Sequence, residues 1–367
     1  MLIPAPVFFI GIIEDVDDPQ MLGRVRVRAM VWHSADRSVL PTDGLPWAHV
    51  MLPTSTASVA GIGTTPHGLL PGSVVLGIFV DGESAQTPMV LGSITGSYTE
   101  KPSKEWGFAD PSGKYPPEES DDGQSTVDEP DTNRLARAAN TQKTLLKRKE
   151  DDRDKDVIIA LQPNDKWSEP ASPYGAQYPH NKVEMTESGH VVEMDDTPGA
   201  ERIHEWHKSG TFVETAPDGS QTTRIVGQRY EIVHKDGYLH VKGVCTITVD
   251  DKAKVYVGGD AQIQVDGNAT GYVAGDVKLN IDGNTQIEAE KDISVTAKGK
   301  FKVHAHDNIE LSTAGGANLT MAGSGRTIFL NSAWNTKYIP PPEEAASAVE
   351  EAVAIPSGGD VGIGPQQ

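Results

Sequence analysis

The sequence predicts an all-β protein in which a small N-terminal barrel precedes a long repetitive β rod. Its 367 residues include 37 Gly and 25 Pro with only 6% aromatic residues, a composition typical of turn-rich β architecture. Short stretches of alternating apolar residues, broken by turn signals, run from Phe8 to Gly96. The region from Cys245 to Ser324 divides into ten consecutive octads that share one phase. These observations favour strands throughout and few helices.

Charge and composition exclude several classes of function. A net charge of -20 disfavours binding to nucleic acid or to anionic lipid. The single cysteine, Cys245, excludes an internal disulfide framework and a Cys-cluster zinc site, and its inward octad position predicts a small buried side chain. The start of the chain has no basic region and too short an apolar run for a secretion signal or membrane helix. We expect synthesis and folding in the cytoplasm.

Five strands in about 90 residues fit a small closed barrel. In the run from Gly23 to Arg28 the valines can face the barrel core, whereas the arginines are expected to face solvent or a partner. The stretch from Gly61 to Gly68 superficially matches a dinucleotide-binding loop, but Pro66 replaces its third glycine and no helix follows. We therefore predict no nucleotide site.

Each octad is expected to be a five-residue strand followed by a corner. Glycine permits the turn conformation, and it fills the seventh position at residues 259, 267, 275, 283, 299, 315 and 323. Odd positions point inward and even positions outward. The third position is apolar or small in every octad: Ile247, Val255, Ile263, Gly271, Leu279, Ile287, Val295, Val303, Leu311 and Leu319. The period leaves two architectures open, one chain coiled alone or three chains intertwined.

Several stretches resemble one known family. GIIEDVDDPQMLGRVRVR, LPWAHVMLP, PGSVVLGIFVDG and PMVLGSITG are similar to the OB-fold domain that opens the central spike protein of contractile-tailed phages, a domain shared with type VI secretion spikes. KPSKEWGFADPSGKYPP, at 101–117, is similar to the segment that leaves this barrel toward a lysozyme domain in the phage branch. ESGHVVEMDDTPGAERI resembles the hairpins that lead into the spike. The octads resemble the intertwined trimeric β-helix, or β-prism, of the phage spike.

This resemblance implies five segments. We expect an OB-fold domain at 1–98, a linker with a short helix around Asn133 to Arg148 at 99–169, and a β-hairpin region at 170–243. The triple-stranded octad β-helix is expected at 244–333, followed by a flexible tail at 334–367. With strands ~4.8 Å apart, ten trimeric layers make a rod of roughly 50 Å.

The linker departs from the family because fewer than 50 residues, between Pro117 and Pro163, leave no room for a lysozyme. Its acidic run is interpreted as a solvated charge run rather than a glycosidase pair, which needs two rigidly held carboxylates. The run contains Glu118, Glu119, Asp121 and Asp122. Mixed charge blocks instead indicate a linker that docks on the barrel of its own or a neighbouring subunit.

Histidines are the remaining candidates for chemistry. Five of them show no metal-binding spacing and are interpreted as exposed strand residues beside acids: His190, His204, His207, His234 and His240. His304 and His306 lie on one side of a strand, where a threefold axis could gather them around iron, but the octad phase sends both to solvent. We therefore predict no catalytic, cofactor-binding or metal-binding residue and no cofactor.

The resemblance implies a structural function. The expected protein is the homotrimeric central spike of a contractile phage tail baseplate, located in the virion and assembled in the host cytoplasm. Its expected partners are a separate tail hub protein at the OB-fold end and a small conical tip protein at the C-terminal end, and it contacts the host outer membrane as the sheath contracts.

Two kinds of alternative are weighed against this function. The first is the spike of a phage-derived contractile injection or type VI secretion machine, which is disfavoured because no hub domain precedes the barrel. The second comprises a hydrolase and a glycan-binding adhesin. A hydrolase is disfavoured because no nucleophile, base and orienting group recur together.

Overall fold

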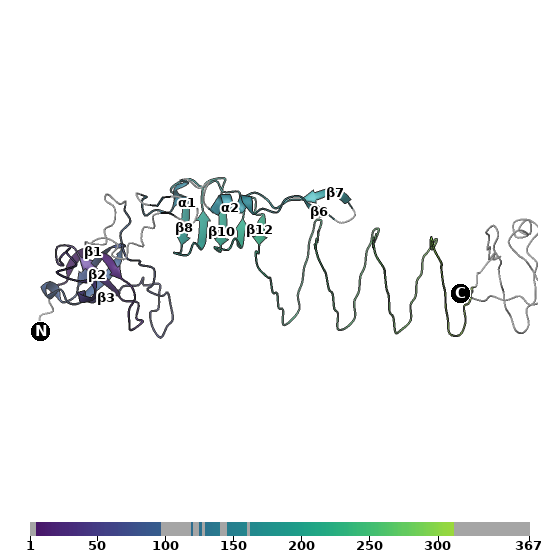
Figure 1. The fold of residues 1–367 in the computed structure, drawn as a ribbon, viewed down its shortest axis with the longest axis horizontal. Coiled ribbons are helices and arrows are strands. Elements are labelled where there is room, and N and C mark those ends of the chain that lie inside the picture. Colours follow the sequence, from purple (N-terminus) through teal and green to yellow (C-terminus); the bar gives the residue numbers. More distant parts are fainter. Residues whose placement is uncertain are drawn as a thin grey trace, which may run out of the picture. The chain divides into compact units, whose positions relative to one another are not determined.

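The computed structural model describes residues 5–96, 119, 125–126, 129–139, 145–159 and 162–311. The chain divides into two units, Met1–Ala274 and Gly275–Gln367, and the described part is almost entirely strand or extended chain (Figure 1). No helix in the described ranges is long and apolar enough to cross a membrane. The expectations for the 101–117 segment, for the octads beyond Leu311 and for the tail lie outside the described residues.

The predicted N-terminal barrel is confirmed. Its strands close in the order β1-β2-β3-β5-β4, with β3 and β5 parallel and the other pairs antiparallel. The strands are β1 Val7–Asp15, β2 Val25–Ala29, β3 Trp47–Val50, β4 Val74–Phe79 and β5 Pro88–Ser93. Two 3-10 turns, Thr42–Gly44 and Gly82–Ser84, lie in the connections.

Alternating residues fill the barrel core, as the strand period requires. The buried set is Phe9, Ile13, Val25, Val27, Ala29, Ala48, Val75, Phe79 and Val90. Gly77 shows how closely β4 approaches its neighbours, because a Cβ there would lie 2.3 Å from Phe9 Cζ and 2.7 Å from the Met89 carbonyl oxygen. Only glycine fits at this position without moving β1 or β5.

The expectation that all the arginines of β2 face solvent or a partner is wrong for Arg28. Its side chain is fully buried, and Nε and Nη2 donate to Glu14 at 2.6 and 3.0 Å. The same guanidinium donates to the carbonyl oxygens of Ser34 and Leu40 at 2.6 and 2.8 Å. The connection between β2 and β3 therefore folds back over the outer side of β2, and strand alternation alone does not reveal such a cover.

A second sheet follows the linker. Its five antiparallel strands lie in consecutive order: β8 Asn181–Met185, β9 Val191–Asp195, β10 Arg202–Trp206, β11 Phe212–Thr215 and β12 Gln221–Arg224. Leu135 of helix α1 (Arg134–Arg137) packs in one cluster with Val191, Trp206 and Phe212, and Leu145 of helix α2 (Leu145–Asp151) packs against that cluster. One sheet face is thereby covered by the linker.

The described linker contains more structure than the short helix expected there. It holds α1, α2 and a two-stranded hairpin of β6 Val157–Ile159 and β7 Gln162–Trp167. The described part of the linker contacts the second sheet, since Arg148 donates to the carbonyl oxygens of Lys208 and Ser209 at 2.6 and 3.0 Å. The charged residues of this segment thus include specific contacts as well as solvated side chains.

Bends recur every eight residues after β12, with extended chain between them (Figure 1). They fall at 226–227, 234–235, 242–243, 250–251, 258–259, 266–267, 274–275, 282–283, 290–291, 298–299 and 306–307. The conformational period therefore equals the sequence period, but it starts before residue 244, where the prediction begins the repeat. Leu239, Val241 and Gly243 already fit octad positions three, five and seven.

Arg28→Ala is expected to destabilise the barrel by about 3–5 kcal/mol, because it leaves the buried Glu14 carboxylate without its charge partner. The measurement is the free energy of unfolding in urea. Val39→Ser, at a 70% exposed position in the same connection, is the control and should change stability by less than about 0.5 kcal/mol. Equal effects of the two substitutions would contradict this account of Arg28.

Candidate functional site

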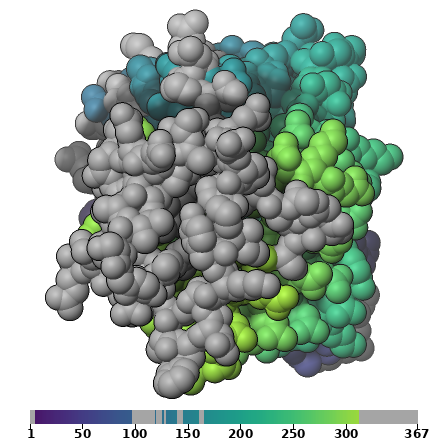
Figure 2. All heavy atoms as spheres, turned by 90° about the vertical axis from the view of Figure 1, so that its right-hand side faces the viewer, coloured from purple at the N-terminus to yellow at the C-terminus, as the bar shows by residue number. Residues whose placement is uncertain are grey.

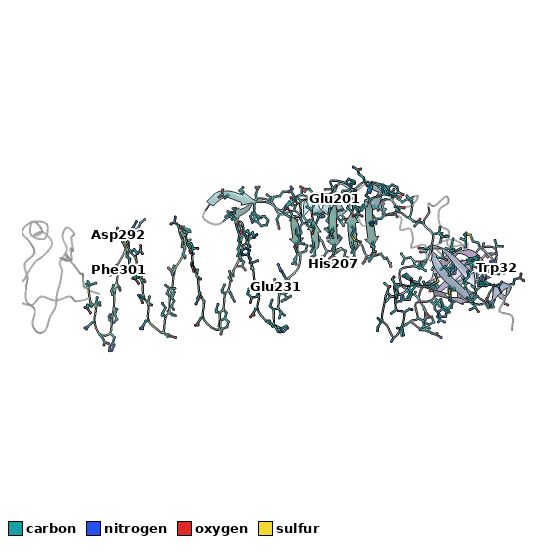
Figure 3. All side chains as sticks on the ribbon, turned by 180° about the vertical axis from the view of Figure 1, so that it is seen from behind. Trp32, Glu201, His207, Glu231, Asp292 and Phe301 are labelled. Atoms are coloured by element: carbon teal, nitrogen blue, oxygen red, sulfur yellow. The ribbon has the colours of Figure 1, made fainter. Side chains whose placement is uncertain are left out.

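The octad segment exposes the residues that its pattern predicts to be inward. Ile263 is 93% exposed and Val265 53% exposed, and Figure 3 shows Phe301 projecting from the extended chain. Residues 227–311 contain no strand and make no backbone hydrogen bond to one another. Buried backbone groups need hydrogen-bond partners, and apolar side chains favour burial. Residues 227–311 therefore expose unpaired backbone groups and apolar side chains that further strands could cover.

The sequence-predicted residues of the described octads, up to Leu311, are therefore at the surface. Cys245 is exposed rather than buried, because no neighbouring strand covers it. His304 and His306 are also exposed, and His306 Nδ1 lies 2.9 Å from the Asp307 carboxylate. Figure 2 shows octad residues, in green to yellow-green, at the molecular surface. The described residues include no group of three or more His, Cys, Asp or Glu that could hold a metal.

The uncovered face of the second sheet is a further apolar surface, which we call the open sheet face. It consists of Val192, Met194, Ile203 and Val213, all between 36% and 58% exposed. Met194 lies directly opposite Ile203 across β9 and β10, and Val192 and Val213 flank Glu205 from either side. Four apolar side chains thus adjoin on strands that lead directly into the octads.

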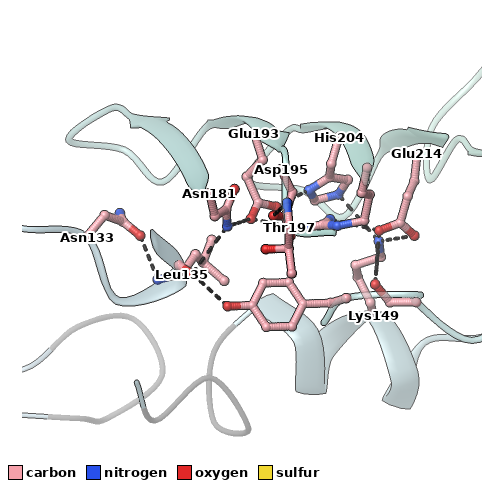
Figure 4. A network of polar contacts seen from close by, with 12 residues as sticks. Asn133, Leu135, Lys149, Asn181, Glu193, Asp195, Thr197, His204 and Glu214 are labelled. Carbon is pink, nitrogen blue, oxygen red and sulfur yellow. Dashed lines mark hydrogen bonds and ion pairs between the residues drawn. The ribbon is translucent and has the colours of Figure 1, made fainter. Parts of the chain in front are cut away.

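The covered face of this sheet holds a buried cluster, which we call the ion network (Figure 4). Arg202 donates to Glu193 at 2.8 Å and to Glu214 at 2.9 Å. Lys149 of α2 lies 2.6 Å from the second oxygen of Glu214. His204 Nδ1 lies 2.7 Å from Glu193, and its Nε2 lies 3.4 Å from Lys149 Nζ. All five side chains are at most 4% exposed.

The strand register assembles this network. His204 is paired with Glu193 on one side and with Glu214 on the other, so all three side chains lie on one face. Lys149 comes from the linker and supplies a second cation beside Arg202. The two carboxylates are therefore matched by two cations, which buried charges require.

The expectation of exposed strand histidines is wrong for His204, which is fully buried. The structure buries the charged set of the ion network beside the apolar cluster around Trp206, and it leaves Met194 and Ile203 exposed. The missed signal is that Glu193, Arg202, His204 and Glu214 share one face and can neutralise one another. Their cover, α2, comes from a distant part of the chain.

Burial and charge shift the pKa values in the network. Burial lowers the pKa of His204, and Lys149 and Arg202 add to this, outweighing Glu193. The histidine is thus neutral, with Nδ1 donating to Glu193 and Nε2 accepting from Lys149. Burial alone would raise the pKa of Glu193. The hydrogen bond from His204 and the charge of Arg202 outweigh this effect and lower the pKa to about 2. The carboxylates are therefore ionised.

Comparisons with known proteins identify relatives of this chain. Residues 31–176 match the family model of the Gp5 N-terminal OB domain. Protein Gp5 of Vibrio phage KVP40 is 36% identical over 275 residues, which cover 67% of this chain and 64% of the relative. The pre-baseplate central spike protein Gp5 of Enterobacteria phage T4 is 40% identical over 114 residues, or 30% of this chain and 20% of the relative. The chain thus spans less than two thirds of either relative.

Lys149→Met is expected to release α2 from the sheet, because the Glu214 carboxylate loses the cation that α2 contributes. Hydrogen exchange of residues 145–151 should accelerate by about 100-fold, which corresponds to about 3 kcal/mol. Lys147→Met is the matched control on the same helix, because Lys147 is 58% exposed and its pair with Asp151 is a surface pair. Equal exchange in the two variants would contradict a role for the buried pair.

His204→Gln is expected to flatten the pH dependence of stability. The pKa of His204 is lowered in the folded protein, so its contribution is full above about pH 6.5 and falls with acidification as the unfolded chain takes up a proton. The loss is at most about 1.4 kcal/mol per pH unit. The melting temperature of the parent should therefore fall more between about pH 7 and about pH 5.5 than that of the variant. Parallel profiles would rule out this titration.

Proposed function

The chain is related to the Gp5 spike proteins of phage baseplates, and we propose that it is the structural homotrimeric central spike of a contractile phage tail. In this proposal the barrel end attaches to a separate hub protein, and a small conical protein caps the C-terminal end. Contraction of the sheath drives the spike through the host outer membrane. The protein is assembled in the host cytoplasm and is then carried in the virion.

The main support for this proposal is the octad segment, whose described residues have unpaired backbone groups and exposed apolar side chains. Three copies can each supply one strand per layer and turn to the next face at every bend, so that strands stack and backbone groups pair. The odd positions then fill the interior, where each fully buried Val, Leu or Ile contributes about 1.5–3 kcal/mol. A single coiled chain would pair with itself, whereas the described residues after β12 form no strand with one another.

The open sheet face supports the same assembly. Its apolar residues lie on strands whose other face is already covered by α1 and α2, so a partner must cover this one. The strands lead through Ile225 and Val226, both exposed, into the first bend. A threefold arrangement that buries the odd octad positions can bury this face as well.

A stiff rod fits the proposed mechanical role. Layers ~4.8 Å apart give roughly 50 Å for ten trimeric octads, and paired strands on every face resist bending and unwinding. The two relatives named above come from phages, which favours a phage spike over a secretion spike.

We propose no enzymatic step. His204, the buried histidine of the ion network, has both ring nitrogens engaged by Glu193 and Lys149 and is sealed from solvent. A general base must reach a substrate proton, and His204 cannot. His304 and His306 are proposed to be solvated side chains on the outside of the rod rather than iron ligands.

The full chain is expected to be trimeric by light scattering and to resist detergent. Val265→Asp should abolish this trimer, because three carboxylates would be placed at one level of a dry core. Gln264→Asp is the matched control, since the neighbouring even position faces outward and should leave the trimer intact. A monomeric parent protein, or a trimer in both variants, would contradict the proposed rod.

A further inference from the structure

Among the described residues, the β6–β7 hairpin pairs with no further strand. A two-stranded hairpin is at best marginally stable in water. Val157 lies opposite Trp167, so these two residues share one face, while Ile158 lies on the other. Ile158 is 55% exposed and Trp167 45% exposed. Large apolar residues on so small an element indicate a surface that is covered in the assembled protein.

One contact shows where this hairpin lies. The Thr248 hydroxyl donates to the Ile158 carbonyl oxygen at 3.4 Å, across 90 residues of sequence. Thr248 is the fourth residue of the octad that begins at Cys245, and even positions face outward. The hairpin therefore lies on the outer side of the upper octads and leaves the inner side free for the rod core.

The outer positions of these upper octads are unusually apolar. They carry Tyr230, Ile232, Tyr238 and Tyr256, which flank Thr248 in sequence and are all strongly exposed. Further along the chain, apart from Tyr272, the outer positions are mainly polar, including Gln262, Gln264, Lys278, Asn280, Gln286 and Glu288. The apolar outer surface thus coincides with the octads at which the hairpin makes its contact.

The distance between strand layers determines which copy of the chain the hairpin contacts in the proposed trimer. Neighbouring strands are ~4.8 Å apart, so a hairpin of two strands covers more than one layer. In an intertwined trimer the layers above and below an octad on one face belong to other copies. A hairpin seated on the layer of Thr248 must therefore also contact a strand of a neighbouring copy.

We propose that the β6–β7 hairpin is an outer clasp that seats on the octads between Tyr230 and Tyr256 and bridges its own strand to a second copy of the chain. This inference rests on the proposed trimer. The clasp ties the linker of one copy to the rod of another, so the first layers cannot separate without releasing it. It is an interface between copies on the outside of the rod, distinct from the apolar interior.

The test replaces Trp167 with the photo-crosslinking residue p-benzoyl-phenylalanine in the full chain. After irradiation and boiling in denaturant, we expect a band of two joined copies, several-fold stronger than with the same replacement at Ile62. Ile62 is 66% exposed in a barrel loop and serves as the control. Mass spectrometry should find the attachment within residues 229–256.

A second measurement does not depend on the crosslinker. Trp167→Ser should accelerate hydrogen exchange in residues 229–256 about tenfold, which corresponds to about 1.4 kcal/mol, while Lys166→Ser on the same strand leaves it unchanged. A trimer whose crosslinks stay within one copy, or fall outside these octads, overturns the clasp and leaves the proposed spike standing. A monomer overturns the spike and the clasp together.

Discussion

Backbone hydrogen bonding is the constraint on which the rest of the structure depends. The barrel and the second sheet pair their strands internally, the second sheet along four strand pairs. The described octads, up to Leu311, instead place apolar side chains at alternate positions of a chain that forms no strand there. Water can solvate such a backbone only while the apolar residues stay exposed. In the proposed trimer, stacked strands from other copies would pair the backbone and bury the apolar side chains together, and they would also cover the open sheet face.

The second sheet has an unusual distribution of residues. A charged cluster is buried beneath α2 beside the apolar residues that contact the linker, and a second apolar set, including Met194 and Ile203, is exposed on the other face. Desolvating five ionisable groups is expensive, so the arrangement depends on complete mutual pairing, which Lys149 completes from outside the sheet. The linker is consequently a structural part of the sheet, although its composition is that of a solvated tether.

Strand alternation was sufficient to predict the barrel, the hairpins and the eight-residue period, because each follows from local sequence. It could not predict which face of a strand becomes covered. Arg28 and His204 are buried by segments that arrive from elsewhere, the β2–β3 connection and α2. The start of the repeat was missed because Glu231 occupies an inward third position. The β6–β7 hairpin was missed because its short strands lie within a charged linker.

The regular bends have a consequence for how such a rod can change during evolution. Insertion or deletion of eight residues preserves the phase of every later octad and alters the rod by one layer, ~4.8 Å in a trimer. Any odd-numbered change instead turns the whole distal segment inside out. The length of the proposed rod can therefore vary only in discrete steps, each of which adds or removes whole octads.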